Sequence, residues 1–225
     1  MNNVSFQGEH GAYSESAARK FFGNDVKTIP CKSFEDALKI TEEDGSNYSV
    51  LPVENSIEGT VGQSIDAITN TNLHSIGEVY LKVEHCLIGK GKLEDIKTVY
   101  SHPQALGQCS NFIQNRKLQT VPTYDTAGSV KIVKEMDDVQ SASIASYDAG
   151  KLYDVPIIEE GIENNSNNFT RFLIFSKENS SESSNDKTSI MFSVKHEPGA
   201  LSVSYTHLRA HETSLHLVCR LLLEK

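Results

Sequence analysis

The fold of this chain is constrained most strongly by a repeated pattern: a short apolar run leads into a polar cluster and then into a helix-start signal. Strands are expected at residues 4–6, 27–29, 48–51, 97–100, 120–121, 143–145 and 172–175. Strands that alternate with helices are typical of α/β proteins. We therefore predict an α/β fold with mostly parallel strand pairing.

Two alternating segments in the middle of the chain predict long strands, at residues 75–79 and 81–87, where a crossover between two lobes is plausible. The apolar strand at 172–175 predicts that the chain later returns to the first lobe. The polar clusters should then meet in a cleft, since open α/β sheets bind ligands at the carboxyl ends of their strands. The expected division is lobe 1 at about 1–78 and 165–176, and lobe 2 at about 79–164.

Charge and composition exclude several classes of partner. The 225 residues carry a net charge of −9, which argues against a nucleic-acid partner or an anionic membrane surface, because both need a basic face. An anionic ligand must therefore be held by a few local donors. The segment Met1–Phe6 lacks the features of a signal peptide, and the scattered cysteines indicate free thiols, so we expect a cytoplasmic protein.

The segment Asn167–Phe172 is a polar cluster that runs directly into an apolar strand. Thr170 supplies a hydroxyl group, and Arg171 supplies a guanidinium group that can bind a carboxylate through two parallel hydrogen bonds. The alternative interpretation is a turn that caps the strand and leaves Arg171 in solvent, since Asn and Thr are ordinary turn residues.

A second polar cluster, Glu54–Val61, follows the strand expected at 48–51. Its two carboxylates, Glu54 and Glu58, are candidates for an acid and base pair. The alternative is that they are favourable charges at the start of a helix.

A third polar cluster, Ser101–Cys109, follows another expected strand. Gln104 and Gln108 are four residues apart and share one face of the expected helix. His102 is a candidate general base, although a histidine at a helix start is more often a cap. Cys109 is a poor candidate for a nucleophile, because no basic neighbour is present to lower its pKa.

Several familiar motifs are absent, including the phosphate loop, the dinucleotide glycine fingerprint and the Gly-x-Ser-x-Gly elbow. His207, His211, His216 and Cys219 suggest a zinc site, but His211 and His216 are one residue too far apart for His-Glu-x-x-His. The residues alone therefore indicate a two-lobed α/β protein with a cleft for a small anion, without metal or nucleotide. A binding protein and a cofactor-free lyase both remain open.

Three of these segments, taken together and in order, resemble the prephenate dehydratase family: Leu51–Val61, Ser101–Ala105 and Asn168–Phe172. Shorter matches lie in the same order at Gly8–Glu15, His85–Leu87 and Asp125–Ala127. The resemblance extends over roughly residues 4–175.

The resemblance implies a fold like that of the type 2 periplasmic-binding proteins, with the active site in the cleft between the lobes. It implies conversion of prephenate to phenylpyruvate, water and carbon dioxide, without a cofactor. Aromatisation of the ring drives the reaction, so the enzyme mainly orients the substrate and assists departure of hydroxide. A homodimer is expected. The alternatives are arogenate dehydratase and a non-catalytic two-lobed module that binds small anions.

By resemblance, Thr170 is the catalytic hydroxyl that donates a hydrogen bond to the leaving group, and Arg171 binds a substrate carboxylate. The full set of expected substrate-binding residues is Asn55, Ser56, Ser101, Gln108, Thr126, Ala127, Arg171 and Phe172. Glu54 and His102 are further candidates, with structural support as their alternative role.

A polar linker is expected at residues 177–187. After it, Thr188–Leu201 resembles the start of an ACT domain, the module through which the family senses phenylalanine. Residues 202–225 do not continue the resemblance. We therefore predict an incomplete ACT domain and lost or weak feedback by phenylalanine.

Overall fold

The computed structural model describes residues 2–181, 187, 197–199 and 202–203. The described residues 2–181 form one compact unit. The predicted ACT segment and the tail lie almost wholly outside the described residues and stay predictions. The residues of the predicted linker that are described, 177–181 and 187, contain no helix or strand. Among the described residues, no helix is long and apolar enough to cross a membrane.

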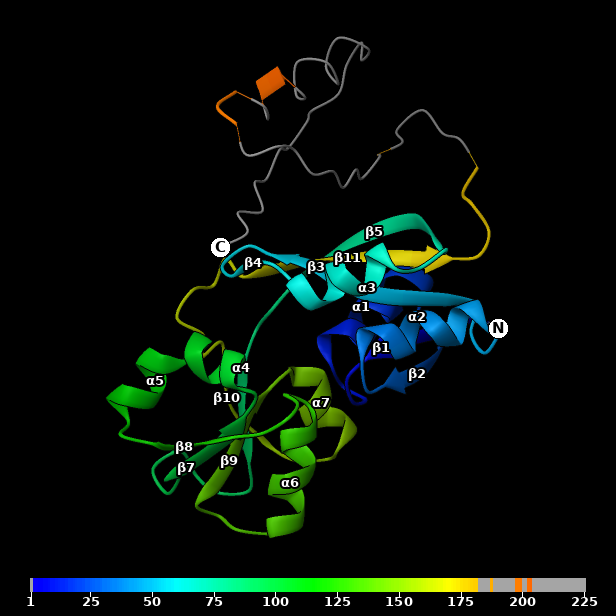
Figure 1. Cartoon of the computed structure of the whole chain (residues 1–225). Coiled ribbons are helices and arrows are strands. Elements are labelled where there is room, and N and C mark those ends of the chain that lie inside the picture. Colours follow the sequence, from blue (N-terminus) through cyan, green and yellow to red (C-terminus); the bar gives the residue numbers. More distant parts are fainter. Residues whose placement is uncertain (1, 182–186, 188–196, 200–201, 204–225) are drawn as a thin grey trace. The chain divides into compact units, whose positions relative to one another are not determined.

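The compact unit contains two sheets, each with its own helices (Figure 1). The sheet of the first lobe has the strand order β2-β1-β3-β11-β5, and a short strand, β4, pairs with β3. The strands are β1 (Asn3–Gln7), β2 (Lys27–Cys31), β3 (Tyr48–Asn55), β4 (Gly59–Thr60), β5 (His74–Lys82) and β11 (Phe169–Ser176). The helices are α1 (Tyr13–Phe22), α2 (Phe34–Glu42) and α3 (Gly62–Thr69).

The first sheet is buried on both faces because its strands carry apolar residues on both sides. Val50 and Ile174 pack with Ala17 of α1, whereas Leu51 packs with Ala37 of α2 on the other core. Burial of apolar surface on both faces stabilises a sheet covered by helices.

The second lobe has the strand order β10-β6-β9-β7-β8. Its strands are β6 (Cys86–Gly89), β7 (Thr98–Ser101), β8 (Gln119–Pro122), β9 (Ser141–Ala145) and β10 (Ile157–Glu160). Its helices are α4 (Pro103–Gln108), α5 (Ser110–Asn115), α6 (Gly128–Met136) and α7 (Tyr147–Leu152). One apolar core joins the sheet to α4 and α5 and a second joins it to α6 and α7.

The two-lobed α/β architecture predicted from the sequence is confirmed, but the prediction of mostly parallel pairing is wrong. The strands β1, β2 and β3 pair in parallel, as do β7, β8 and β9. The strands next to the crossovers, β5, β6, β10 and β11, pair antiparallel. The two strands that enter a lobe from a crossover, β11 in the first lobe and β6 in the second, run opposite to the parallel strands of that lobe.

The two crossover segments run side by side between the lobes. The N–H of Val83 donates to the carbonyl of Asn168 at 2.8 Å, and the N–H of Ile162 donates to the carbonyl of His85 at 3.1 Å. The strand β5 extends to Lys82, so the first crossover begins a few residues after the predicted boundary at 78. Two paired connections form a natural hinge between lobes.

The loop before α1 in the first lobe packs against α7 of the second. Gly11 has φ +90°, and a Cβ atom added there would lie 2.8 Å from the Cα of Ala149. The Ser146 hydroxyl donates to the Gly11 carbonyl at 2.7 Å, and the Tyr153 hydroxyl donates to the His10 carbonyl at 3.0 Å. Close approach of the two lobes therefore requires glycine at position 11.

We expect Gly11→Ala to lower the free energy of unfolding more than Gly23→Ala does. Both substitutions place a side chain at positive φ, which costs about 1–2 kcal/mol. Only Gly11→Ala adds a steric clash, since nothing lies within 4 Å of a Cβ at Gly23, and overpacking costs about 1–3 kcal/mol. Denaturant unfolding of the two variants measures the difference. Equal losses would show that this contact does not hold the lobes together.

Candidate active site

A cavity of about 410 Å³ lies between the two lobes. This volume is within the range of small-molecule sites, about 300–1,000 Å³. Among the described residues, no lysine or arginine lines the cavity. Instead, the amino-terminal ends of three helices contribute to its wall, through Tyr13 of α1, Gly62 of α3 and Ala127 beside α6. Helix N-termini attract anions through free N–H groups and the helix dipole, so the wall can bind carboxylates without a basic side chain.

Thr170 lies in the cavity wall on β11, directly opposite Asn55 of β3. The Asn55 side chain amide donates from Nδ2 to Thr170 Oγ1 at 2.9 Å. Its Oδ1 accepts from the backbone N–H groups of Ile57 at 2.9 Å and Glu58 at 3.1 Å. These two donors fix the orientation of the amide, because a flipped amide would place its NH₂ against them.

The fixed orientation of Asn55 decides what the Thr170 hydroxyl can do. Thr170 Oγ1 accepts a hydrogen bond from Asn55, so its own hydrogen is available to donate. No protein acceptor for that hydrogen occurs among the described residues. Since Thr170 lines the cavity, the hydroxyl is a hydrogen-bond donor for a ligand there.

Further amides continue from Asn55 into the second lobe. Asn55 Nδ2 also donates to Asn168 Oδ1 at 2.7 Å, and Asn168 Nδ2 donates to Gln108 Oε1 at 3.1 Å. Gln108 Oε1 lies 2.8 Å from His85 Nε2. Asn55 is 5 %, Asn168 0 % and His85 2 % exposed, so the low dielectric strengthens these bonds. We call Asn55, Asn168, Gln108 and His85 the amide chain.

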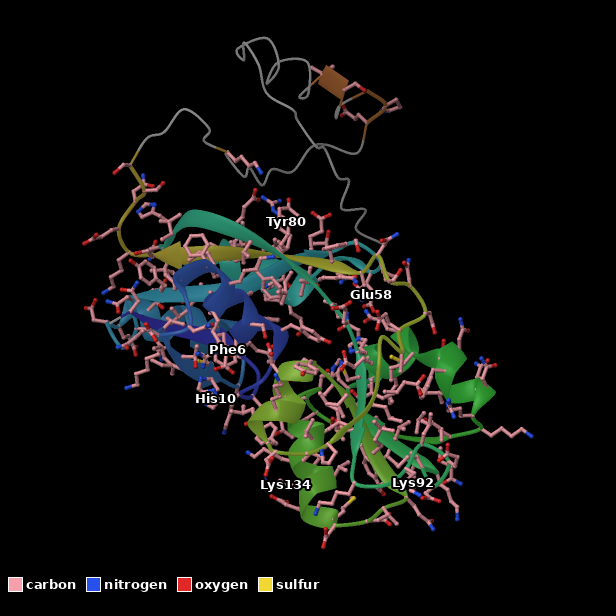
Figure 2. The ribbon with its side chains drawn as sticks, turned by 180° about the vertical axis from the view of Figure 1, so that it is seen from behind. Phe6, His10, Glu58, Tyr80, Lys92 and Lys134 are labelled. Carbon is pink, nitrogen blue, oxygen red and sulfur yellow. The ribbon has the colours of Figure 1, made fainter. Side chains whose placement is uncertain are left out.

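Glu58 joins the two lobes beside the cavity, between the two groups of side chains in Figure 2. Gln104 Nε2 donates to its Oε2 at 2.6 Å, and Gln108 Nε2 donates to its Oε1 at 2.8 Å. Glu58 follows β3, whereas both glutamines belong to α4. These two charge-assisted bonds form only when the lobes are close together.

Burial raises the pKa values of three ionisable groups in or near the site. Burial raises the pKa of Asp125, which lines the cavity, although the Gly128 N–H donates to its Oδ1 at 2.7 Å and opposes the shift. Burial also raises the pKa of the Cys86 thiol to about 12 and raises that of Cys109 still further. Both thiols are therefore protonated and unsuited to nucleophilic attack, as expected for Cys109.

Six of the residues predicted from the sequence line the cavity: Asn55, Gln108, Thr126, Ala127, Thr170 and Phe172. They come from β3, α4, the start of α6 and β11. The structure therefore brings together residues that are more than a hundred positions apart in the sequence.

Five predicted residues do not line the cavity: Glu54, Ser56, Ser101, His102 and Arg171. Ser101 is fully buried, and its hydroxyl donates to the Ile144 carbonyl at 2.6 Å. Ser56 Oγ accepts from the Phe169 N–H at 2.9 Å, and His102 Nδ1 caps α4 through the Gln104 N–H at 3.3 Å. The cap formed by His102 supports the structural alternative for that residue, and the expected substrate contacts of Ser56 and Ser101 stay predictions.

Arg171 does not line the cavity, so its expected contact with a substrate carboxylate stays a prediction. It follows Thr170 on β11, and successive residues of a strand point to opposite faces. Its guanidinium group binds Glu78 of β5, with Nη2 at 2.7 Å and Nε at 2.8 Å from Oε2. The carboxylate that Arg171 binds is therefore part of the protein.

Polar residues that also line the cavity, outside the expected substrate-binding set, include Tyr13, Glu58, His85, Gln104 and Asp125. Of these, Glu58 is expected from the sequence only as half of an acid and base pair, and each lies in a segment that resembles the family. Their roles depend on contacts between the lobes, which no local pattern contains.

We expect Asp125→Asn to stabilise the protein more at pH 7 than at pH 4. Burial raises the pKa of this group in the folded state, so the folded protein disfavours the carboxylate. The destabilisation caused by burying the ionised Asp125 carboxyl is absent at pH values below the pKa of this group in the unfolded chain, about 3.8. It develops as the pH rises from there through the pKa of the group in the folded protein. Asparagine keeps the oxygen that accepts from Gly128. Urea unfolding at the two pH values tests this, with the exposed Asp95→Asn as control. A gain that does not depend on pH would contradict the assignment.

The chain matches the family model for prephenate dehydratase over residues 4–180. It is 42% identical over 202 residues to arogenate dehydratase/prephenate dehydratase 1 of Arabidopsis thaliana, a match that covers 88% of this chain and 51% of that protein. It is 36% identical over 203 residues to the bifunctional chorismate mutase/prephenate dehydratase of Neisseria gonorrhoeae, covering 88% and 56%. The chain thus spans about half the length of the curated relatives that it matches.

Two solved structures resemble this one. The prephenate dehydratase of Arthrobacter aurescens in complex with L-Phe has a TM-score of 0.78 at 24% identity, covering 92% of this chain and 71% of that chain, which shows the fold. GqqA, described as a novel type of quorum-quenching acylase, has a TM-score of 0.76 at 28% identity, covering 92% and 77%. With the family match over residues 4–180, these findings establish that the chain belongs to the prephenate dehydratase family.

Proposed function

We propose that this chain is a carbon–oxygen lyase that converts prephenate to phenylpyruvate, carbon dioxide and water. The observation that carries the proposal is the Thr170 hydroxyl, which accepts from Asn55 and is left to donate into the cavity. A positioned donor is what the departing hydroxyl group of prephenate requires. The family match supports the same reaction.

The reaction needs few protein groups. The electron pair of the bond to the ring carboxylate moves into the ring as carbon dioxide leaves. The carbon–oxygen bond at the opposite ring carbon breaks, and the departing hydroxide takes up one proton to form water. Because the ring becomes aromatic, the enzyme mainly has to orient the substrate and stabilise the charge that develops on the leaving oxygen.

Thr170 acts in this scheme as a hydrogen-bond donor rather than as a strong acid. An alcohol is a poor acid at neutral pH, so the proton that completes water comes finally from solvent. The substrate carboxylates are held by N–H groups at the N-termini of α1 and α3, since no lysine or arginine among the described residues lines the cavity.

Arogenate is a second candidate substrate. It differs from prephenate in carrying an α-ammonium group in place of the ketone. The carboxylates of Glu58 and Asp125 both line the cavity and are suitable partners for such a cation. The relative from Arabidopsis thaliana is named for both substrates. The expected homodimer and the cytoplasmic location stay predictions.

We expect Thr170→Val to lower kcat on prephenate by about 10²-fold or more, since one positioned donor is worth about 2.7–4 kcal/mol. Thr170→Ser keeps the hydroxyl and should retain much of the activity. The assay follows phenylpyruvate formation from prephenate, with arogenate tested in parallel. Substrate binding without turnover by the unaltered chain would instead indicate a binding module.

We expect Asn55→Asp to lower kcat by a similar factor. A carboxylate still accepts from the N–H groups of Ile57 and Glu58, but it cannot donate to Thr170. The Thr170 hydroxyl would then donate to the new carboxylate and no longer to the substrate. Asn115→Asp, at an exposed position at the end of α5, controls for the added charge. Unchanged turnover by Asn55→Asp would contradict the role of Asn55 in orienting Thr170.

A further inference from the structure

His85 is the only side chain among the described lining residues that can become a cation near neutral pH. It lies in the first crossover, just before β6, and is 2 % exposed. The proposed substrates each carry two carboxylates, and the protein has a net charge of −9. A cation in the cavity wall would therefore matter for binding.

The proton on Nε2 of His85 is fixed by the amide chain. Asn55 is oriented by two backbone N–H groups, so it donates to Asn168 Oδ1. Asn168 must then donate to Gln108 Oε1, and Gln108 Nε2 donates to Glu58. The oxygen of Gln108 therefore faces His85 Nε2 at 2.8 Å, and Nε2 must carry a hydrogen to donate to it.

The other nitrogen of His85 faces a group that can either donate or accept. Nδ1 lies 3.1 Å from the Tyr13 hydroxyl oxygen. The same hydroxyl lies 2.5 Å from the Glu84 carbonyl oxygen. When His85 is neutral, Tyr13 donates to Nδ1. When His85 is charged, Nδ1–H donates to Tyr13, which donates in turn to Glu84. Both ring nitrogens of His85 thus have a hydrogen-bond partner in either protonation state.

We propose that His85 is a substrate-binding residue that takes up a proton at Nδ1 when the anionic substrate enters the cavity. Tyr13 turns its hydroxyl from His85 to the Glu84 carbonyl in the same step. The proton comes from solvent, and no other bond forms or breaks. This inference rests on the proposed function, because it requires a substrate with carboxylates.

The charges around His85 are compatible with this proton uptake. Burial lowers the pKa of His85, so the imidazole is neutral in the empty cavity near neutral pH, while its bond to Gln108 and the Glu163 carboxylate oppose the shift. Glu163 Oε2 accepts from the His85 backbone N–H at 2.9 Å.

The remaining neighbours change little on binding. Burial raises the pKa values of Tyr13, Cys86 and Cys109, which therefore stay protonated and neutral. The Glu84 carboxylate is paired with Lys82. A substrate carboxylate is then the added charge that favours the imidazolium.

Proton uptake can be measured directly, without turnover. Thr170→Val serves as the inactive background, and prephenate is titrated into it calorimetrically near pH 7 in buffers that differ in ionisation enthalpy. We expect a net uptake approaching about one proton per bound molecule. Adding His85→Gln keeps an N–H donor for Gln108 but removes the titratable group, and should abolish the uptake while binding persists.

A second variant tests whether a loss of proton uptake in His85→Gln is only a local effect of the glutamine side chain. Tyr13→Phe keeps the ring that packs edge-on to His85, with centroids 5.7 Å apart, but removes the hydroxyl that Nδ1–H needs as an acceptor. We expect it to reduce the uptake by more than half. Binding with undiminished uptake in both variants would overturn the role of His85. Absence of any binding heat for prephenate and arogenate would instead count against the proposed function.

Discussion

The pairing of β11 between β3 and β5 is the constraint on which the rest of the site depends. This antiparallel register places Thr170 opposite Asn55, although the two residues are 115 positions apart. It also brings the end of the second crossover beside the first, where Asn168 bonds to Val83. The strand β11 therefore joins β5 to the sheet of the first lobe, leads in from the second crossover and positions the Thr170 hydroxyl in the cavity wall. A change of register by one residue would turn Thr170 away from the cavity.

The lack of lysine and arginine in the described cavity wall explains why the polar network is buried and oriented in advance. An acidic protein that binds an anion without lysine or arginine must use partial charges, and helix N-termini supply them. Partial charges lose their effect when water screens them, so the donors have to be buried and oriented in advance. A network that is fully hydrogen-bonded meets that need, since any unpaired group would cost about 1–3 kcal/mol. The titratable His85 adds a full charge only where the ligand is present to stabilise it.

The sequence predicted the two lobes and the cleft well, because alternating patterns and polar strand ends are local signals. Thr170, Asn55 and Gln108, which lie in the polar clusters of the sequence, line the cavity, and their functional roles stay predictions. Arg171 does not line it, because it follows Thr170 on β11 and successive residues of a strand point to opposite faces. The pairing was mixed rather than mostly parallel because β6 and β11, the strands that enter a lobe from a crossover, run opposite to the parallel strands. Bridges such as that from Glu58 to Gln104 depend on how the lobes meet and leave no local pattern.

The polarity of the amide chain links closure of the lobes to chemistry. Two backbone N–H groups of the first lobe orient Asn55, which donates a hydrogen bond to Asn168 in the crossover. Asn168 donates in turn to Gln108 of the second lobe, and Gln108 donates to Glu58. If the lobes separate, Gln108 loses Glu58, and only the hydrogen bond from Asn168 then holds its amide in this orientation. The donor role of His85 would depend on that single hydrogen bond. Closure therefore does more than exclude water, since the bond from Gln108 to Glu58 secures the end of the amide chain that contacts His85, whereas the first lobe alone orients the Thr170 hydroxyl.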